Sequence, residues 1–155
     1  MVKQKGIALA VDFCTKNNLP LYVVGDGDEY YFLKKRAGKT IKFFRKCNDK
    51  RKMKLLAQAK ALIYPSIEED FGIVPVEAMS VGTPVIGFAS GGVKETIENG
   101  LTGVLFYKHS IESLEKAINK FNDLKWNQNI CYQQAKKFSE KIFVMKIKEL
   151  INEEL

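Results

Sequence analysis

The chain has 155 residues, a hydrophobic fraction of 46% and a formal net charge of +7. This length predicts a single domain, residues 1–155, that can bury a substantial core. No apolar run reaches the roughly 20 residues that span a bilayer, and no secretory signal precedes the first predicted helix. Cys14, Cys47 and Cys131 are odd in number and widely spaced. We therefore expect reduced thiols and a cytoplasmic location, not a disulfide framework.

The excess of basic residues gathers in three places: Lys34 to Arg36, Lys42 to Lys54 and Lys136 to Lys148. Such clusters suit nucleotide phosphates or peripheral contact with an anionic membrane, and an ordinary solvated surface rich in lysine is equally compatible. No basic motif interleaved with aromatics, as in RNA-recognition domains, is present. We expect no nucleic-acid partner.

In chain order, short apolar runs alternate with amphipathic patterns. The predicted strands are Leu21–Val24, Thr40–Phe44, Ala61–Tyr64, Val85–Phe88 and Val104–Phe106. The predicted helices are Gly6–Asn17, Glu29–Ala37, Lys50–Lys60, Pro75–Val81, Val93–Glu98 and Ser110–Phe121, followed by a helical tail of Trp126–Lys137 and Ser139–Glu154. This alternation indicates an α/β fold with a Rossmann-like, doubly wound parallel sheet.

The segment from Pro65 to Met79 carries the strongest functional signal. It places two carboxylates, Glu69 and Glu77, at either end of a predicted strand-to-helix turn with Gly72 between them. Carboxylates accept hydrogen bonds from hydroxyls, and backbone N–H groups at a helix start bind anions. In an open α/β sheet this turn lies at the carboxyl edge, where ligands bind. The pattern therefore favours a sugar-phosphate ligand.

These residues resemble the E-x7-E signature of the retaining, GT-B-fold glycosyltransferases of family 4. The flanking residues agree, because Ala59–Ser66, Ala78–Ile86, Gly91–Glu95 and Asn99–Phe106 follow in the family's order. The similarity covers nearly the whole chain. It implies the C-terminal, donor-binding domain of an enzyme that transfers a hexose from a nucleoside-diphosphate sugar to a glycan, lipid or other acceptor.

The resemblance also assigns roles. It implies that Glu69 is the catalytic carboxylate beside the donor sugar, and that Glu77 binds the ribose hydroxyls. Phe71, Gly72, Ile73 and Val74 are expected to bind the donor, with its diphosphate at the amides of Ile73 and Val74. Lys5, in a Lys5-Gly6 pair, is expected to grip the same diphosphate.

Gly25 and Gly27 follow a predicted strand and are expected to form a tight turn near the ligand, as nucleotide-base or loop contacts. The resemblance implies that Cys47, which follows the next predicted strand, contacts the nucleotide base. His109, the only histidine, is expected at the surface. The family generally needs no metal, so neither a metal site nor a cofactor is expected.

Two parts of the family's pattern are missing from the sequence. The acceptor-binding N-terminal domain is not present, and neither is the first strand of the doubly wound sheet, so Leu21–Val24 and Ala61–Tyr64 should face a vacant slot or pair directly. We therefore expect an enzyme part that is inactive without a separately encoded N-terminal domain. The alternative is a non-catalytic nucleotide-sugar-binding module or a truncated, inactive remnant.

Overall fold

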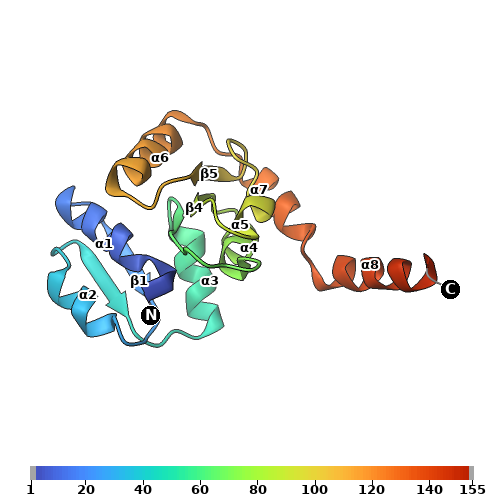
Figure 1. Cartoon of the computed structure of the whole chain (residues 1–155), viewed down its shortest axis with the longest axis horizontal. Coiled ribbons are helices and arrows are strands. Elements are labelled where there is room, and N and C mark those ends of the chain that lie inside the picture. The colour runs from blue at the N-terminus through green and yellow to red at the C-terminus, as the bar shows by residue number, and fades with distance from the viewer. Residues whose placement is uncertain (1–2, 154–155) are drawn as a thin grey trace.

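The computed structural model describes residues 3–153 (Figure 1). Its strands are β1 (Leu21–Val24), β2 (Ile41–Phe44), β3 (Leu62–Tyr64), β4 (Val85–Phe88) and β5 (Gly103–Phe106). Its helices are η1 (Lys3–Lys5), α1 (Ile7–Lys16), α2 (Tyr30–Arg36), α3 (Asp49–Gln58), α4 (Ile73–Met79), α5 (Val93–Thr96), α6 (Ile111–Asp123), α7 (Gln128–Lys136) and α8 (Glu140–Glu153). The chain is thus an α/β protein in which every predicted strand and helix forms, with ends that differ by a few residues.

The strands form two parallel sheets, β1-β2 and β3-β4-β5. Direct pairing of β1 with β3, one of the two predicted arrangements, is not found among residues 3–153. The single sheet expected from the alternation is therefore divided. The division falls where a doubly wound sheet would carry the strand that precedes α1 in sequence order.

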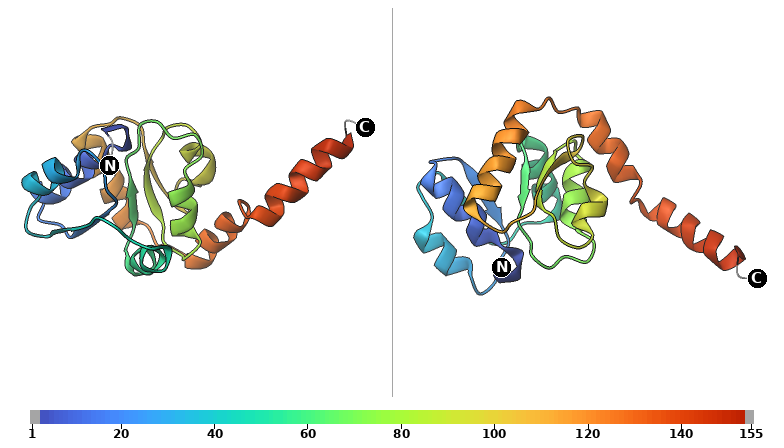
Figure 2. Two further views of the ribbon diagram at one scale, coloured as in Figure 1. Left: turned by 90° about the horizontal axis from the view of Figure 1, so that it is seen from below. Right: turned by 45° about the horizontal axis from the view of Figure 1, so that its top comes forward.

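One hydrophobic core holds the two sheets together. Helix α1 contributes Val11 and Phe13, which belong to the same buried cluster as Val23 of β1, Ile86 of β4 and Leu114 of α6. Because α1 and α6 lie along one face of the strands (Figure 2), residues from both sheets bury their apolar surface against the same helices.

A second core lies on the opposite face of the β3-β4-β5 sheet. It contains Ala78 and Met79 of α4, Val85 of β4, Val93 of α5 and Cys131 of α7. The β3-β4-β5 sheet is therefore covered on both faces, as is usual for parallel sheets. The β1-β2 sheet is covered on one face only, because Tyr22 and Val24 remain 52% and 36% exposed.

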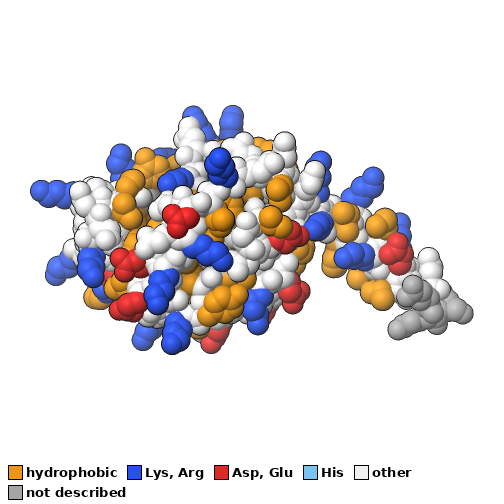
Figure 3. All heavy atoms as spheres, turned by 90° about the horizontal axis from the view of Figure 1, so that it is seen from above, with side chains coloured by type: hydrophobic (Ala, Val, Ile, Leu, Met, Phe, Trp, Pro, Cys, Tyr) orange, Lys and Arg blue, Asp and Glu red, His pale blue; other side chains and the backbone are white. Residues whose placement is uncertain are grey.

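Helix α8 projects away from the body (Figures 1 and 2). Its apolar side chains are left in solvent, with Phe143, Leu150 and Ile151 between 56% and 65% exposed. Figure 3 shows hydrophobic side chains beside basic ones along the projecting helix. Within residues 3–153, no helix is both long and apolar enough to cross a membrane.

Candidate functional site

The site begins at the carboxyl end of β3, where Pro65 and Ser66 turn the chain toward α4. Helix α4 begins at Ile73, with Gly72 as its N-cap at a φ of 82°. The prediction that Pro75 opens this helix is therefore wrong by two residues. Proline fits there because the N–H groups of the first helical turn have no intrahelical partner to lose.

Gly72 is required for its backbone conformation. A side chain there would meet its nearest neighbour, Cγ2 of Val93, at 3.4 Å, which is ordinary contact. The positive φ is the obstacle, because L-residues with a side chain rarely adopt it. Ile73 and Val74 follow at the helix start, and the side chain of Ile73 is 64% exposed.

Glu69 is held from two sides. Its Oε2 accepts hydrogen bonds from Nζ of Lys5, at 2.6 Å, and from the hydroxyl of Tyr64. Burial raises the pKa of the Glu69 carboxyl, but the hydrogen bonds from Lys5 and Tyr64 outweigh it and hold that pKa below its usual range. The same burial and the neighbouring carboxylate raise the pKa of the Tyr64 hydroxyl. Glu69 is therefore ionised and Tyr64 protonated at neutral pH.

Two glycines shape the backbone under Glu69. A Cβ atom on Gly91 would lie 2.0 Å from the Glu69 carbonyl oxygen, and one on Gly92 would lie 2.3 Å from that of Asp70. The amide of Gly92 donates to the carbonyl of Glu69 at 3.2 Å. Gly91 and Gly92 thus form a close turn that positions the loop carrying Glu69.

Glu77 lies in the second turn of α4 and pairs with α3. Its Oε1 accepts a hydrogen bond from Nζ of Lys52 at 2.7 Å, and Lys52 also contacts Asp49 at 3.2 Å. The hydrogen bond to Glu77 raises the pKa of Lys52, although burial opposes it. The second oxygen, Oε2, is buried and has no partner among the described residues. Glu77 thus has one paired and, within residues 3–153, one unpaired carboxylate oxygen.

Lys5 and Gly6 are placed beside this loop by a backbone contact. The amide of Ile67 donates to the carbonyl of Gln4 at 2.8 Å, and a Cβ on Gly6 would lie 2.1 Å from the carbonyl oxygen of Pro65. The positive φ of Gly6, 61°, directs the chain into α1 at this point. The predicted Lys5-Gly6 pair is therefore next to Glu69.

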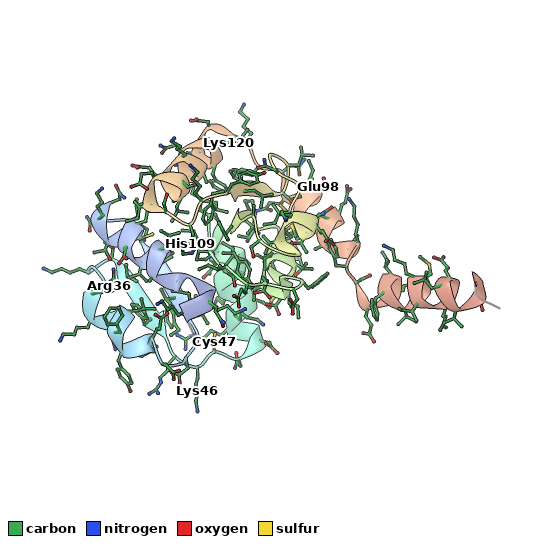
Figure 4. The ribbon with its side chains drawn as sticks, in the orientation of Figure 1. Arg36, Lys46, Cys47, Glu98, His109 and Lys120 are labelled. Atoms are coloured by element: carbon green, nitrogen blue, oxygen red, sulfur yellow. The ribbon has the colours of Figure 1, made fainter. Side chains whose placement is uncertain are left out.

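Phe71, which was predicted to bind the donor, has its ring against the C-terminal segment. The Phe71 and Phe138 rings meet edge to face at 5.5 Å, and Phe71 remains 43% exposed. The only histidine, His109, is exposed, as predicted, but its Nε2 lies 3.0 Å from the Pro65 carbonyl oxygen. Figure 4 places His109 centrally in the molecule, beside α1.

Gly25, Gly27 and Cys47 form a separate group at the carboxyl ends of β1 and β2. Both glycines have positive φ values, 132° and 134°, and the turn is closed by an ion pair between Asp26 and Arg45 at 2.8 Å. Cys47 is half-buried in the loop that follows β2, near Lys46 (Figure 4). Within residues 3–153, no side-chain hydrogen bond or ion pair joins this group to Glu69 or Glu77.

Two residues of the site, Lys52 and Tyr64, were not predicted from the sequence, and neither was the contact of His109 with Pro65. Lys52 lies on α3, and its partner Glu77 is 25 residues away on α4. Only the packing of the two helices brings them together. Tyr64 is the last residue of β3, and its place five residues before Glu69 was a usable signal. In the described part of the chain, no group of three His, Cys, Asp or Glu side chains could hold a metal ion.

Comparisons with known proteins agree on one family. The profile of the family described as glycosyl transferases group 1 matches residues 1–138. The human alpha-1,3/1,6-mannosyltransferase ALG2 is 37% identical over 106 residues, which cover 63% of this chain and 26% of that protein. The glycogen synthase of Thermodesulfovibrio yellowstonii is 32% identical over 151 residues, which cover 92% of this chain and 29% of that enzyme.

Solved structures show the same fold. The apo lipopolysaccharide outer core galactosyltransferase WaaB aligns with 98% of this chain at a TM-score of 0.86 and 20% identity, over 46% of its own length. HepE of Anabaena, in complex with UDP-glucose, aligns with 99% of this chain at a TM-score of 0.76 and 22% identity, also over 46% of its length. The chain spans less than a third of the two curated relatives and less than half of these structures. Its architecture is that of the C-terminal Rossmann-like half of GT-B glycosyltransferases, and the chain belongs to the glycosyl transferases group 1 family.

Proposed function

We propose that this chain is the donor-binding part of a retaining hexosyltransferase that uses a nucleoside-diphosphate sugar. The observation that carries the proposal is the pair Glu69 and Glu77, each fixed by its own lysine, at the two ends of the turn between β3 and α4. Support comes from a structural neighbour described in complex with UDP-glucose and from a mannosyltransferase relative.

In this proposal Glu77 binds the ribose. Lys52 fixes the Oε1 atom, which leaves the buried Oε2 atom to accept a hydrogen bond from a diol. A buried acceptor without a partner is unfavourable, and a ribose hydroxyl would satisfy it. Gly25, Gly27 and Cys47 are proposed to lie near the base.

The diphosphate is proposed to lie at the start of α4. The backbone N–H groups of Ile73 and Val74 have no intrahelical acceptors there. Lys5 adds a positive charge from the other side of the loop, and its contact with Glu69 leaves two further ammonium protons for phosphate oxygens. These groups would bind the diphosphate and partly offset its charge, and no metal ion or cofactor is proposed.

Glu69 is proposed to act at the donor sugar. A carboxylate stabilises positive charge as it develops on the sugar only if it is ionised, and Lys5 and Tyr64 keep Glu69 ionised at neutral pH. Fixing the carboxylate by two hydrogen bonds also reduces the reorganisation needed during the reaction.

The acceptor site is proposed to lie on a second, N-terminal domain, because the relatives are more than twice the length that this chain spans. The chain alone should therefore bind donor nucleotides and transfer no sugar. We propose that the complete enzyme acts in the cytoplasm on a glycan, lipid or other acceptor.

Calorimetry with UDP, GDP and their hexose conjugates tests donor binding. We expect dissociation constants in the micromolar to millimolar range, about 4 to 8 kcal/mol of binding free energy. Glu77→Ala should weaken nucleoside diphosphate binding by about 1–3 kcal/mol, because the ribose loses a charged acceptor. Glu69→Ala should leave this binding nearly unchanged. Glu115→Ala, on the exposed face of α6, is the matched control.

Three results would contradict the proposal. Absence of binding to all these nucleotides would reject a donor site. An equal loss in Glu69→Ala and Glu77→Ala would reverse the assignment of roles. Sugar transfer by the purified chain alone would show that the acceptor site is already present, whereas binding with no transfer after an N-terminal domain is supplied would favour a non-catalytic module.

A further inference from the structure

The positive charge of the protein is concentrated in one stretch. Residues 30–54 contain eleven Lys and Arg and a single acidic residue, Asp49, whereas the rest of the chain contains 14 basic and 17 acidic residues. The whole excess of +7 therefore arises from α2, β2 and the first part of α3. Figure 4 shows Arg36 and Lys46 on the same lower left side of the molecule.

Most of these cations are not neutralised. Only Arg36, Arg45 and Lys52 form ion pairs within residues 3–153, with Asp12, Asp26 and the pair Asp49 and Glu77. The other eight are exposed and have no acidic partner there: Lys34, Lys35, Lys39, Lys42, Lys46, Lys50, Arg51 and Lys54. Repulsion among like charges is unfavourable, and an anionic partner would relieve it.

Exposed aromatic rings lie among these cations. Tyr22, Tyr31 and Phe32 are 52%, 66% and 60% exposed. Lys42 lies 5.9 Å from the ring centroid of Tyr22, Arg45 5.3 Å from that of Tyr31, and Arg36 5.3 Å from that of Phe32. Large exposed rings beside Lys and Arg are typical of proteins that rest in the headgroup region of a membrane, where rings sit at the interface and cations meet lipid phosphates.

We propose that this basic–aromatic surface, formed by Tyr22, Tyr31, Phe32 and the eight unpaired cations, binds an anionic phospholipid membrane. The contact is peripheral, because Phe32 and Tyr31 can enter only the interfacial layer while the lysines stay at the phosphates. The surface is separate from Glu69. Its members Arg51 and Lys54 flank Lys52, which holds Glu77, so a bound membrane would lie beside the candidate donor site.

A single-stranded nucleic acid is the competing partner, because it too binds aromatic rings in a basic groove. Stacking of bases requires free ring faces. Here cations already lie over the rings of Tyr31, Phe32 and Phe44, the last at 4.8 Å from Arg51. Insertion of a ring beside lipid headgroups needs no free face, so the geometry favours the membrane.

Co-sedimentation of the full chain with vesicles tests the proposal. Binding should be strong to vesicles of equimolar phosphatidylglycerol and phosphatidylcholine, weak to phosphatidylcholine alone, and reduced by added salt. The triple variant Lys34→Gln, Lys35→Gln and Lys39→Gln should bind the anionic vesicles about a hundredfold more weakly, since three lysines near the surface at about 1 kcal/mol each amount to two factors of ten.

A charge-matched control separates a surface effect from a general one. Lys116→Gln, Lys120→Gln and Lys125→Gln remove the same charge from exposed positions on and after α6 and should leave binding unchanged. Phe32→Ser should weaken the binding that persists at high salt. All seven side chains are exposed, so the variants should keep the wild-type unfolding midpoint and nucleotide binding.

The proposal is overturned by any of three results. The wild type fails to distinguish anionic from neutral vesicles, the α6 control loses as much binding as the α2 variant, or single-stranded poly(U) binds more tightly than the anionic vesicles. Because nucleotide binding is measured separately, failure here leaves the proposed donor site standing, and loss of the donor site leaves vesicle binding unaffected.

Discussion

The two sheets are built from similar sequence and end in different environments. β1 (LYVV) and β4 (VIGF) are both four-residue apolar strands between helices. Three of the four residues of β4 are buried, but only Val23 of β1 is. β4 has a strand on each edge and a helical layer on each face, whereas β1 has β2 on one edge and helices on one face. Burial is therefore set by neighbours, and a short strand's own sequence does not reveal it.

In the two proposals above, this difference corresponds to a division of roles. The β3-β4-β5 half presents Glu69 and Glu77 beside a sheet that is covered on both faces. The β1-β2 half presents exposed rings and most of the positive charge. A site that must hold two carboxylates in register benefits from the first environment, and a surface that meets a large partner needs the second.

The largest expected contrast between the halves is in hydrogen exchange. The amides of Leu21 and Gly25 donate to β2, so the amides of Tyr22 and Val24 point to the other edge of β1. They should exchange almost without protection. The amide of Ile86, in the central strand, should exchange only on global unfolding. Its free energy of opening should therefore be at least about 5 kcal/mol higher than that of Tyr22 or Val24. Exchange measured by NMR checks this, and strong protection at Val24 would show that the β1 edge is covered.

The next contrast uses one glycine from each half. A Cβ on Gly103 would lie 2.1 Å from the backbone oxygen of Val85 in the neighbouring strand, which cannot move aside cheaply. Gly103→Ala should lower the free energy of unfolding by about 3 kcal/mol. At Gly38, before β2, the nearest atom is a methyl of Thr15 at 3.3 Å, so Gly38→Ala should cost less than about 1 kcal/mol.

Urea unfolding of both variants gives these values. Similar losses of unfolding free energy in the two variants would mean that both sheets are packed equally tightly and unfold as one cooperative unit. That outcome would contradict the difference between the sheets described above.

How well the sequence predicts a feature of this structure depends on how far apart along the chain the interacting residues lie. Leu21–Val24 and Val85–Phe88 were predicted with their observed bounds, because apolar runs bounded by proline and glycine encode strands locally. The helix beginning near Ser110 was also predicted, and the Ser110 side chain caps it by accepting a hydrogen bond from the amide of Ser113. Both features depend only on residues a few positions apart.

Non-local contacts were harder to anticipate. The start of α4 was misplaced because proline is compatible with any position of the first turn, and nothing in the sequence distinguishes Ile73 from Pro75 as the first helical residue. The Lys52–Glu77 pair depends on how α3 packs against α4. The exposed face of β1 depends on which helices cover it, which the alternation of apolar runs does not encode.

A third prediction compares one ion pair from each half. Lys52 and Glu77 are each less than a third exposed, whereas Arg45 and Asp26 are 51% and 36% exposed. Lys52→Met should lower the free energy of unfolding by about 1 kcal/mol, because it leaves both oxygens of Glu77 without a partner. Arg45→Met should cost clearly less than Lys52→Met, as is usual for solvent-exposed pairs.

Thermal or urea unfolding at neutral pH distinguishes the two variants. A larger loss for Arg45→Met would indicate that its contacts with the rings of Tyr30 and Tyr31, and not the ion pair, dominate.

The smallest expected effect is the pH dependence contributed by Glu69. Its pKa is below the ordinary value in the folded protein, because Lys5 and Tyr64 stabilise the carboxylate more than burial destabilises it. The unfolded protein therefore binds a proton at this position first as the pH falls. The stabilisation is complete above the ordinary glutamate pKa of about 4.3, and it is lost as the pH decreases through the lower folded value.

Because Lys5 is partly exposed, this contribution should be less than about 1 kcal/mol. This contribution can be measured by unfolding the wild type and Lys5→Gln at a series of pH values from neutral to acid. The difference between their free energies of unfolding should shrink as Glu69 is protonated. Asp12→Asn removes the ion-pair partner of Arg36 in the other half of the molecule. The difference in unfolding free energy between wild type and Asp12→Asn should not follow the pH profile set by Glu69. A constant difference between wild type and Lys5→Gln across the acid range would mean that Lys5 stabilises the loop through packing and not through the charge of Glu69.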